Sequence, residues 1–487
     1  MTLAKLGSYF ICFALLQLFL VAIPPTGAEP KSRVACLDEN GKAVDWYIGY
    51  KFPKIKTDTR FNTGYAYAYL TSEQASENQA QLKKAVELPE HGDSKLSSIA
   101  YRFRNLLLRY AGFGNKATEE RASKKVQPAK EVRWSLSTNL INDQHSALLR
   151  TVAAAYDPQI SAVLYNDDSG EVENRNENDD GDDEGDSNSE TGTERAQQAG
   201  RTERKKRHNN SQKAHAKGVL MMDQQADQGV WVTHSIPRFP PRLNEPLVFP
   251  ESAQFYGQTF MCISFDLSKM GNMVVEHLRT MKPQVFDRRV SESLYEMMPN
   301  LKDLDTSDNL KARGKRIGVK PKLAQLITTS GGQLINLFSK SKGFDKDLYA
   351  GWIDEELGTA LYVETWRRGA GNPLDSSCPA DEYHINNVKD LKYDDVARWS
   401  YKNDHSKWAI SEEEADAHVC IGDSNRMESQ FKRGGGAVCI KCPDCWSIFS
   451  NTILDVEPCP RGSSKARRKQ MDADQGLLKR IGRVLHL

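Results

Sequence analysis

A long acidic segment near the middle of the chain limits what this sequence can fold into. Residues 167–190 contain twelve Asp or Glu residues and one basic residue, Arg175, and Gly, Asn and Ser fill most other positions. Such a composition buries too little apolar surface to offset the entropy lost on ordering, so we expect disorder over about 166–212. The folded mass then comes from two blocks, roughly 36–165 and 208–460, enough for one large domain or two halves.

The N-terminus has the pattern of a secretory signal peptide. Residues 9–23 form an apolar run that is too short for a comfortable membrane span. Lys5 precedes this run and small residues follow it, so we expect residues 1–28 to be removed after Ala28. A short membrane anchor is the alternative, and the prolines at 24–25 disfavour it. Because no second long apolar segment follows, we expect a secreted chain without stable membrane association.

Eight cysteines stay in the chain once Cys12 leaves with the signal peptide. An oxidising compartment favours their pairing, but eight cysteines allow roughly a hundred connectivities, so spacing alone selects none. Cys442 and Cys445 could bind zinc, although a structural zinc site needs four ligands and secretion favours a disulfide. Asn209 begins a glycosylation sequon, which agrees with the same route.

Short apolar segments predict a fold that mixes strands and helices. Period-two or β-branched patterns indicate strands over 64–70, 160–165, 217–222, 230–233 and 260–265. Helical spacing is found over 269–281, 287–298 and 321–339. These elements indicate an α/β fold or an α+β sandwich and leave the strand order open. Trp352 and Trp408 are expected in the core rather than stacked on bases.

Two tripeptides carry the chemistry that the sequence offers. They are His215-Ala216-Lys217 and His405-Ser406-Lys407, and each borders a strand-like run. Residues i and i+2 of an extended chain point to one side, so each motif presents an imidazole and an ammonium together. An ammonium can hold anionic oxygens, and an imidazole can attack phosphorus or carry a proton. One such motif often arises by chance, whereas two in matching contexts predict catalysis on a phosphodiester.

Polar residues follow the strand-like run near each motif. His234 is a further catalytic candidate, although it could equally bond backbone at a turn. Near the second motif, the candidates for binding the substrate are Asp423, Asn425, Arg426 and Arg433. The two arginines would supply fixed positive charge. Asp423 and Asn425 could instead only shape a turn.

With these motifs the chain resembles the deoxyribonuclease II family, a branch of the phospholipase D superfamily. The matching stretches are 36–47, 164–167, 215–219, 234–240, 256–259, 347–352, 404–408, 420–426 and 433–436. They spread over nearly the whole mature chain, and the stretches 404–408 and 433–436 are specific. The resemblance implies a pseudo-dimer in which two sheet-and-helix halves, 29–275 and 276–460, share one active-site cleft. A basic tail, 461–487, follows.

The resemblance also implies the reaction. The expected substrate is double-stranded DNA, cut in the lysosome or outside the cell at acid pH, without metal or another cofactor. One neutral histidine attacks phosphorus and forms a phosphohistidine. The other donates its proton to the 5′-oxygen and then activates water, which leaves 3′-phosphate and 5′-hydroxyl ends. By analogy with the superfamily, His215 is expected to be the nucleophile and His405 the acid, while Lys217 and Lys407 stabilise the transition state.

The chain departs from the superfamily pattern in the carboxylates that follow the motifs. Asp223 lies one residue later than the pattern asks, and Glu412 stands near the expected place in the second half. The carboxylates that orient the histidines are therefore not assigned. The resemblance further implies the disulfides Cys36–Cys262, Cys378–Cys459 and Cys420–Cys439, with Cys442 and Cys445 bonded to each other or reduced.

Two other function classes stay open. One is another phosphodiesterase of the superfamily, acting on lipid head groups, and the other is a secreted DNA-binding or toxin-like relative without turnover. The basic residues 204–207 resemble a site for proprotein convertases, so nicking after Arg207 is a further hypothesis. The acidic run could compete with DNA for a basic cleft, although a solvated loop without a role is the simpler explanation. The sequence does not indicate an oligomeric state.

Overall fold

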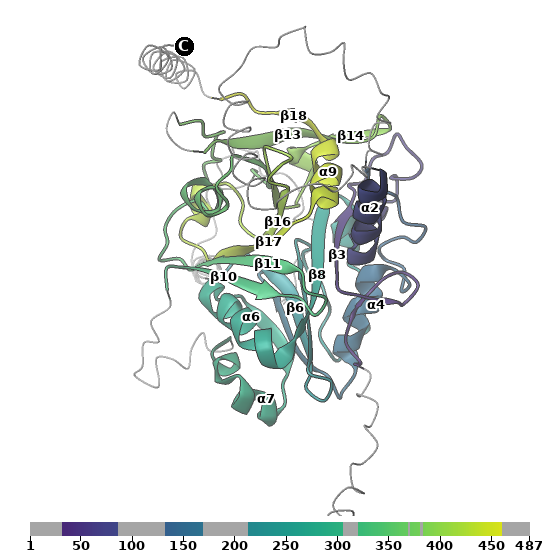
Figure 1. Cartoon of the computed structure of the whole chain (residues 1–487), viewed down its shortest axis with the longest axis vertical. Helices are drawn as coiled ribbons and strands as arrows, with labels where there is room; N and C mark the ends of the chain where they lie inside the picture. The colour runs from purple at the N-terminus through teal and green to yellow at the C-terminus, as the bar shows by residue number, and fades with distance from the viewer. Residues whose placement is uncertain are drawn as a thin grey trace, which may run out of the picture.

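Two large β-sheets with few helices make up the described part of the protein in the computed structural model (Figure 1). The structure describes residues 32–85, 132–168, 213–304, 320–368, 371–379 and 383–459. This mixture of strands and helices confirms the mixed fold expected from the sequence, an α/β fold or an α+β sandwich.

The first sheet has seven strands, all paired antiparallel, in the order β4-β3-β8-β7-β6-β5-β9. Its strands are β3 (Trp46–Lys51), β4 (Tyr67–Thr71), β5 (Ser161–Asn166), β6 (Lys217–Asp223), β7 (Gln228–His234), β8 (Gln258–Asp266) and β9 (Val285–Arg289). A separate small pair joins β1 (Cys36–Leu37) to β2 (Ala43–Val44). All five strands predicted from the sequence are confirmed in this sheet. Its last strand lies beyond residue 275, where the first half was expected to end.

The second sheet has nine strands in the order β10-β11-β17-β16-β15-β12-β13-β14, and β18 also pairs with β13. Only the β12–β13 pair is parallel among the pairs of this sheet in the described residues. The strands are β10 (Lys322–Thr328), β11 (Leu334–Lys340), β12 (Leu361–Glu364), β13 (Ile385–Tyr393), β14 (Ala397–Ser400), β15 (Trp408–Ser411), β16 (His418–Gly422), β17 (Gly435–Lys441) and β18 (Ile453–Val456).

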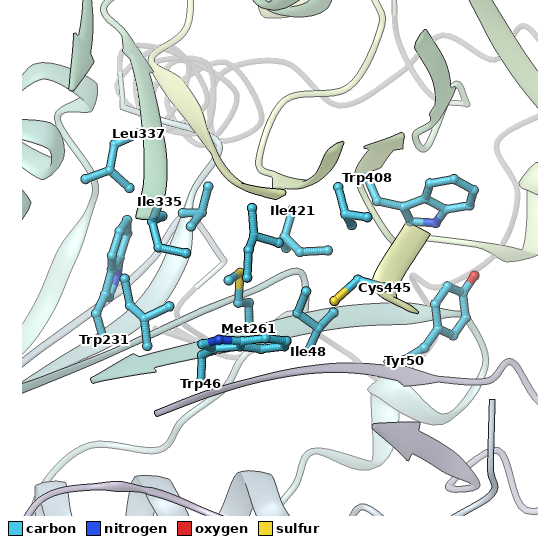
Figure 2. Packing of buried hydrophobic residues seen from close by; sticks show 14 of the residues in the cluster. Trp46, Ile48, Tyr50, Trp231, Met261, Ile335, Leu337, Trp408, Ile421 and Cys445 are labelled. Atoms are coloured by element: carbon cyan, nitrogen blue, oxygen red, sulfur yellow. The ribbon is translucent and has the colours of Figure 1, made fainter. Parts of the chain in front are cut away.

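The two sheets pack face to face over a common core. Along β3, Trp46 and Ile48 point into this core, while Tyr47 between them points to the outer face of the first sheet. On β16, Ile421 points into the same core and Cys420 points outward. Figure 2 shows Trp46 and Ile48 facing Ile421 across the gap between the sheets. Buried apolar residues on both faces explain why these strands read as nearly continuous apolar runs.

Helices complete the core and cover the outer faces. In the described residues the α-helices are α2 (Ser72–Ala85), α4 (Ala147–Ala153), α6 (Leu267–Met281), α7 (Glu292–Met297), α8 (Asp354–Leu357) and α9 (Pro443–Thr452). The short 3-10 or π-helical segments there are η1 (Ala154–Tyr156), η2 (Glu251–Gln254), η3 (Pro299–Leu304), η4 (Tyr349–Ile353), η5 (Tyr401–Asn403) and η6 (Glu428–Gln430). Residues of α6 and α9 join the central core, and α4 packs on the outer face of the first sheet. In Figure 1, α6 lies beneath the β10–β11 pair.

The helix predictions succeed once. The helix expected over 269–281 is α6, but the segment 287–298 is split between β9 and the shorter α7. The helix expected over 321–339 is wrong, because this segment forms the β10–β11 hairpin. Its turn contains Gly332 at a φ of +94°, and the backbone NH of Gly331 donates to the Asp45 carboxylate at 2.7 Å. The positive φ, which favours glycine, and the hydrogen bond to Asp45 therefore fix a hairpin turn here in spite of the helical spacing of the apolar residues.

Four disulfides connect the described cysteines. Cys36–Cys262, Cys378–Cys459 and Cys420–Cys439 are as expected from the family resemblance. The fourth joins Cys442 to Cys445 at the start of α9, so of the alternatives left open for this pair the structure has the disulfide. Trp352 and Trp408 are buried in the core, as expected.

Several sequence expectations concern residues that the structure does not describe. The signal peptide, Asn209, the basic cluster before Arg207, the tail and most of the acidic segment lie outside the described residues. The expected disorder from about residue 166 is wrong at its first positions, because Asn166 ends β5 and Asp167, whose side chain is 11% exposed, directly follows that strand. Within the described ranges, no helix has the length and apolar character needed to cross a membrane.

Candidate active site

Each His-x-Lys motif is held in place by a glycine from the other part of the sequence. The first motif runs into β6, and the backbone NH of His215 donates to the carbonyl of Gly434 at 3.0 Å. The second motif directly precedes β15, and the backbone NH of His405 donates to the carbonyl of Gly257 at 2.8 Å. These reciprocal hydrogen bonds place both motifs at the junction of the two sheets.

Close backbone contact explains why glycine occupies both positions. A Cβ added at Gly257 would lie 2.6 Å from the carboxylate oxygens of Asp404. A Cβ added at Gly434 would lie 1.8 Å from the carbonyl oxygen of Met281. Any side chain at either position would push the motif away from its partner. The stretch of three glycines after Arg433 therefore has a structural reason.

His215 has an acceptor facing each ring nitrogen. Its Nδ1 lies 2.7 Å from the backbone oxygen of Asp423, and because a carbonyl oxygen only accepts, Nδ1 carries a proton. Its Nε2 lies 3.7 Å from Oδ2 of Asp167. Burial lowers the pKa of His215 well below its usual range, the charge of Asp167 opposes that change, and nearby cations reinforce it.

Asp167 is the anion at the centre of a group of cations. Its carboxylate accepts from Nζ of Lys217 and lies 3.0 Å from Nη2 of Arg433. Burial alone would raise the pKa of this carboxyl, but the charges of Lys217, His215 and Arg433 hold it well below its usual range. Asp167 is therefore ionised, and it orders Lys217 and Arg433 around the imidazole of His215.

His405 is held by aromatic rings instead of a carboxylate. Its ring stacks on Tyr256 with centroids 4.1 Å apart and meets Trp366 at an angle of 77° with centroids 3.9 Å apart. Its Nε2 is buried and has no hydrogen-bond partner among the described residues. Burial lowers the pKa of His405 well below its usual range, and the charges of Lys407 and Lys217 act in the same direction.

Two buried groups support the position of His405. Lys51 donates to the backbone oxygens of Gln254 at 2.9 Å and of Tyr256 at 2.6 Å, which fixes the loop that carries the stacked ring. The carboxylate of Asp404 accepts from Nε1 of Trp399 at 2.7 Å, from the hydroxyl of Tyr50, and from the backbone NH of Ser406 at 2.8 Å. These three donors occupy Asp404, so it anchors the motif backbone.

The charge of the lysine in the first motif acts on the lysine in the second. Burial first, and then the charge of Lys217, lowers the pKa of Lys407 to about 7. Burial raises the pKa of the Asp423 carboxyl to about 8, against the charges of both lysines. Nζ of Lys407 donates to the backbone oxygen of His405 at 2.6 Å. Both motifs therefore belong to one electropositive site.

His234 lies at the end of β7 beside this site. Its Nδ1 accepts from the backbone NH of Ile236 at 3.2 Å, so its proton is on Nε2, which is buried and has no partner among the described residues. Burial and then the charge of Lys217 lower the pKa of His234 to about 3. The hydrogen bond between His234 and the backbone, one of the two roles predicted for this residue, is therefore present. The neutral ring also has an N–H donor, at Nε2, that no described residue uses.

The four candidate substrate residues are placed differently from one another. The backbone oxygen of Asp423 contacts His215 of the first motif, and Arg433 bonds the Asp167 carboxylate beside that motif. Asn425, on the same loop as Asp423, has a buried Oδ1 without a partner in the described part of the chain. Arg426 is placed elsewhere than predicted. Its guanidinium is 2% exposed and bonds Oδ2 of Asp347 at 3.1 Å and the side-chain oxygen of Asn387, so it braces the fold.

Four residues of the site were not predicted from the sequence: Asp167, Lys51, Tyr256 and Trp366. Asp167 had a usable signal, since it directly follows a predicted buried strand, but its acidic neighbours concealed it. The other three are distant in sequence from the histidine that they support and become neighbours only through the fold. Among the described residues, no group of three or more His, Cys, Asp or Glu side chains is arranged to hold a metal ion.

Comparison with known proteins agrees with this arrangement. The family model for deoxyribonuclease II matches residues 35–97 and 117–459. Cell-death-related nuclease 7 of Caenorhabditis elegans is 31% identical over 254 residues, which cover 52% of this chain and 66% of that protein, just under two thirds of its length. Deoxyribonuclease-2-alpha of Bos taurus is 26% identical over 455 residues, covering 92% of this chain and 95% of the relative. For deoxyribonuclease-2-beta of Homo sapiens the identity is 26% over 454 residues, covering 92% and 96%. Because the family match includes both histidine motifs and both sheets, the chain belongs to the deoxyribonuclease II family.

Proposed function

We propose that the protein is a metal-independent acid endonuclease that hydrolyses double-stranded DNA to 3′-phosphate and 5′-hydroxyl ends. The observation that carries the proposal is the meeting of two His-x-Lys motifs, from distant parts of the chain, in one buried electropositive site. Two imidazoles supply a nucleophile and an acid, and two ammonium groups supply positive charge for phosphoryl oxygens. The family of the chain supports DNA as the substrate.

The architecture that we propose is a pseudo-dimer whose two sheet-and-helix halves share this cleft. Its support is the reciprocal bonding of each motif to a glycine of the other half and the common core between the sheets. In this arrangement Lys217, Lys407 and Arg433 hold the phosphate, and Asn425 and the unused donor of His234 contact its remaining oxygens. Arg426 keeps the cleft in shape without touching DNA.

Acid pH fits the reaction that we propose. The mechanism needs one neutral and one protonated histidine, and it passes through a phosphohistidine on the neutral one. Burial lowers the pKa values of His215 and His405 below that of a free imidazole, so a proton is gained only as the pH falls. We therefore place the enzyme in the lysosome or in another acidic space reached by secretion.

Digestion of supercoiled plasmid at mildly acid pH in excess chelator tests the proposal. We expect nicking and linearisation by the wild-type protein, and no cleavage by His215→Ala or His405→Ala at unchanged fold and secretion. Labelling of the products should find phosphate on 3′ ends. Hydrolysis of a phospholipid head group in place of DNA would favour another superfamily phosphodiesterase. Retention of DNA on a filter without cleavage would favour a binding protein, and near-normal cleavage by His405→Ala would refute the two-motif mechanism.

We also propose that processing nicks the chain after Arg207. Strands β3 and β5 from before this position and β6 and β8 from after it are paired in one sheet, and Cys36–Cys262 links the two parts covalently. The two parts of the nicked protein would therefore stay together as one folded unit. Gels of the secreted protein with and without reductant provide the test, and a single full-length band under reducing conditions would exclude nicking.

A further inference from the structure

The two histidines of the proposed reaction lie in unlike electrostatic surroundings. Both nitrogens of His215 face oxygen acceptors, the Asp423 carbonyl at 2.7 Å and the Asp167 carboxylate at 3.7 Å. An imidazole with an acceptor at each nitrogen is best satisfied when both nitrogens carry protons. Three cations also face His215 and oppose this doubly protonated form; they are Lys217, Lys407 and Arg433. Asp167 is the anion that offsets their charge.

Among the described residues, no anion offsets the cations around His405 in this way. The charged groups that act most strongly on it, Lys407, Lys217, His215 and Lys51, are all cationic. The neighbouring Asp404 already accepts three hydrogen bonds, and the rings of Tyr256 and Trp366 orient the imidazole without an acceptor oxygen at Nε2. With its Nε2 unpartnered, His405 is best suited to stay neutral and to present a lone pair.

We propose that Asp167 is a positioning residue that assigns the catalytic proton to His215, so that His405 is the nucleophile. This inference rests on the proposed function and reverses the roles expected from the superfamily analogy. A carboxylate close to one imidazole of a pair favours the proton on that ring. Asp423 adds little charge to the competition, because burial raises the pKa of its carboxyl to about 8 and leaves it neutral at acid pH.

The reaction that we propose has two steps. The lone pair on Nε2 of His405 attacks phosphorus, the bond from phosphorus to the 5′-oxygen breaks, and that oxygen takes the proton from Nε2 of His215. Water then attacks the phosphohistidine and gives a proton back to Nε2 of His215. The phosphorus–nitrogen bond breaks, its electron pair returns to His405, and the 3′-phosphate leaves.

A substrate with an activated leaving group separates the two roles. Thymidine 3′-(4-nitrophenyl phosphate) releases nitrophenolate, which needs no proton, so the acid becomes dispensable in the first step only. We expect His215→Ala to release about one nitrophenolate per enzyme and then stall, while its DNA cleavage falls by roughly 100-fold to 10,000-fold, which leaves none to be detected in the plasmid assay. His405→Ala should lose both activities. A burst with His405→Ala and none with His215→Ala would overturn the assignment.

A second measurement needs no variant. Wild-type enzyme mixed with the same substrate is quenched in alkali, where phosphohistidine is stable, and the labelled peptide is identified by mass spectrometry. Label on the peptide that contains His405 supports the assignment, and label on the peptide that contains His215 overturns it. These outcomes are distinct from failure of the proposed function, because a protein that does not cleave plasmid in chelator fails before either assay begins.

The role of Asp167 is tested by Asp167→Asn with Asp168→Asn as the matched control. Asp168 is the next residue, its side chain is 52% exposed, and it pairs with Arg238 outside the site. Loss of the carboxylate should move the alkaline limb of the rate of DNA cleavage to lower pH by roughly 1–3 units and leave the nitrophenolate burst in place. Asp167→Glu should restore part of the shift, and Asp168→Asn should cause none. An unmoved limb in Asp167→Asn, with DNA cleavage reduced equally at every pH, would refute the proton assignment.

Discussion

Replacement of Asp423 by Asn should change the dependence of folding stability on pH. Burial raises the pKa of this carboxyl from 3.8 to about 8, so the folded protein binds the proton more tightly than the unfolded chain. The stability contributed by the protonated group is complete below about pH 4 and is lost as the pH rises towards 8. Over this window the loss amounts to about 1.4 kcal/mol per pH unit, or about 2.7 kcal/mol between pH 5 and pH 7.

Urea unfolding of wild-type protein and Asp423→Asn at pH 5 and pH 7 measures this loss. The amide stays neutral at both values, and the backbone carbonyl that accepts from His215 is retained. The wild type should therefore lose about 2.7 kcal/mol relative to the variant on going to pH 7, because contributions from groups that do not interact with Asp423 cancel in the double difference. Asp168→Asn, with its exposed side chain, is the control and should behave as the wild type. A double difference below about 0.5 kcal/mol, the usual error of additivity, would refute a raised pKa at Asp423.

Three further outcomes are expected. Lys217→Ala and Lys407→Ala should each lose roughly 3 kcal/mol of transition-state stabilisation, seen as a fall of about 100-fold or more in the rate of plasmid cleavage at saturating DNA; wild-type rates would remove them from the mechanism. Arg426→Met should cost about 3–5 kcal/mol in the free energy of unfolding, because it leaves the buried carboxylate of Asp347 unpaired. An unchanged unfolding midpoint together with weakened DNA binding would instead support the predicted role of Arg426 as a substrate ligand. In the chain before any nicking, loss of the Cys36–Cys262 disulfide through Cys36→Ser with Cys262→Ser should cost about 5 kcal/mol through the entropy of the 226-residue separation, and denaturant titration without reductant would detect it.

The strands of the first sheet were predictable because they are both apolar and short. β6 and β7 are buried on both faces, so their sequences lack polar interruptions and end at turn residues. The hairpin over 322–340 was wrongly predicted as a helix, because the spacing of its Leu and Ile residues fits a helical period as well as an alternating one. The glycine pair in its turn held the deciding information.

The site residues that are close together in the sequence could be predicted, and those that only the fold brings together could not. His215 with Lys217, and His405 with Lys407, could be recognised because two residues apart on an extended chain suffice to bring imidazole and ammonium together. Asp167 was grouped with an acidic run because composition was averaged over its neighbours, while its own position at a strand end decides its role. Arg426 was assigned by charge alone, and only its buried partners show that it braces the fold.

The interleaving of the first sheet bears on how this protein can be cut and rejoined. Strand β5 comes from before residue 169, yet it lies between β6 and β9, which come from after residue 212. A fragment 29–168 made alone would expose the edges of β3 and β5, and its complement would expose the edges of β6 and β8. Neither fragment can complete the sheet without the other, so co-expression should reconstitute activity from two inactive pieces. The same position offers new termini for a circular permutant, and it makes the chain a natural candidate for a split reporter of nuclease assembly.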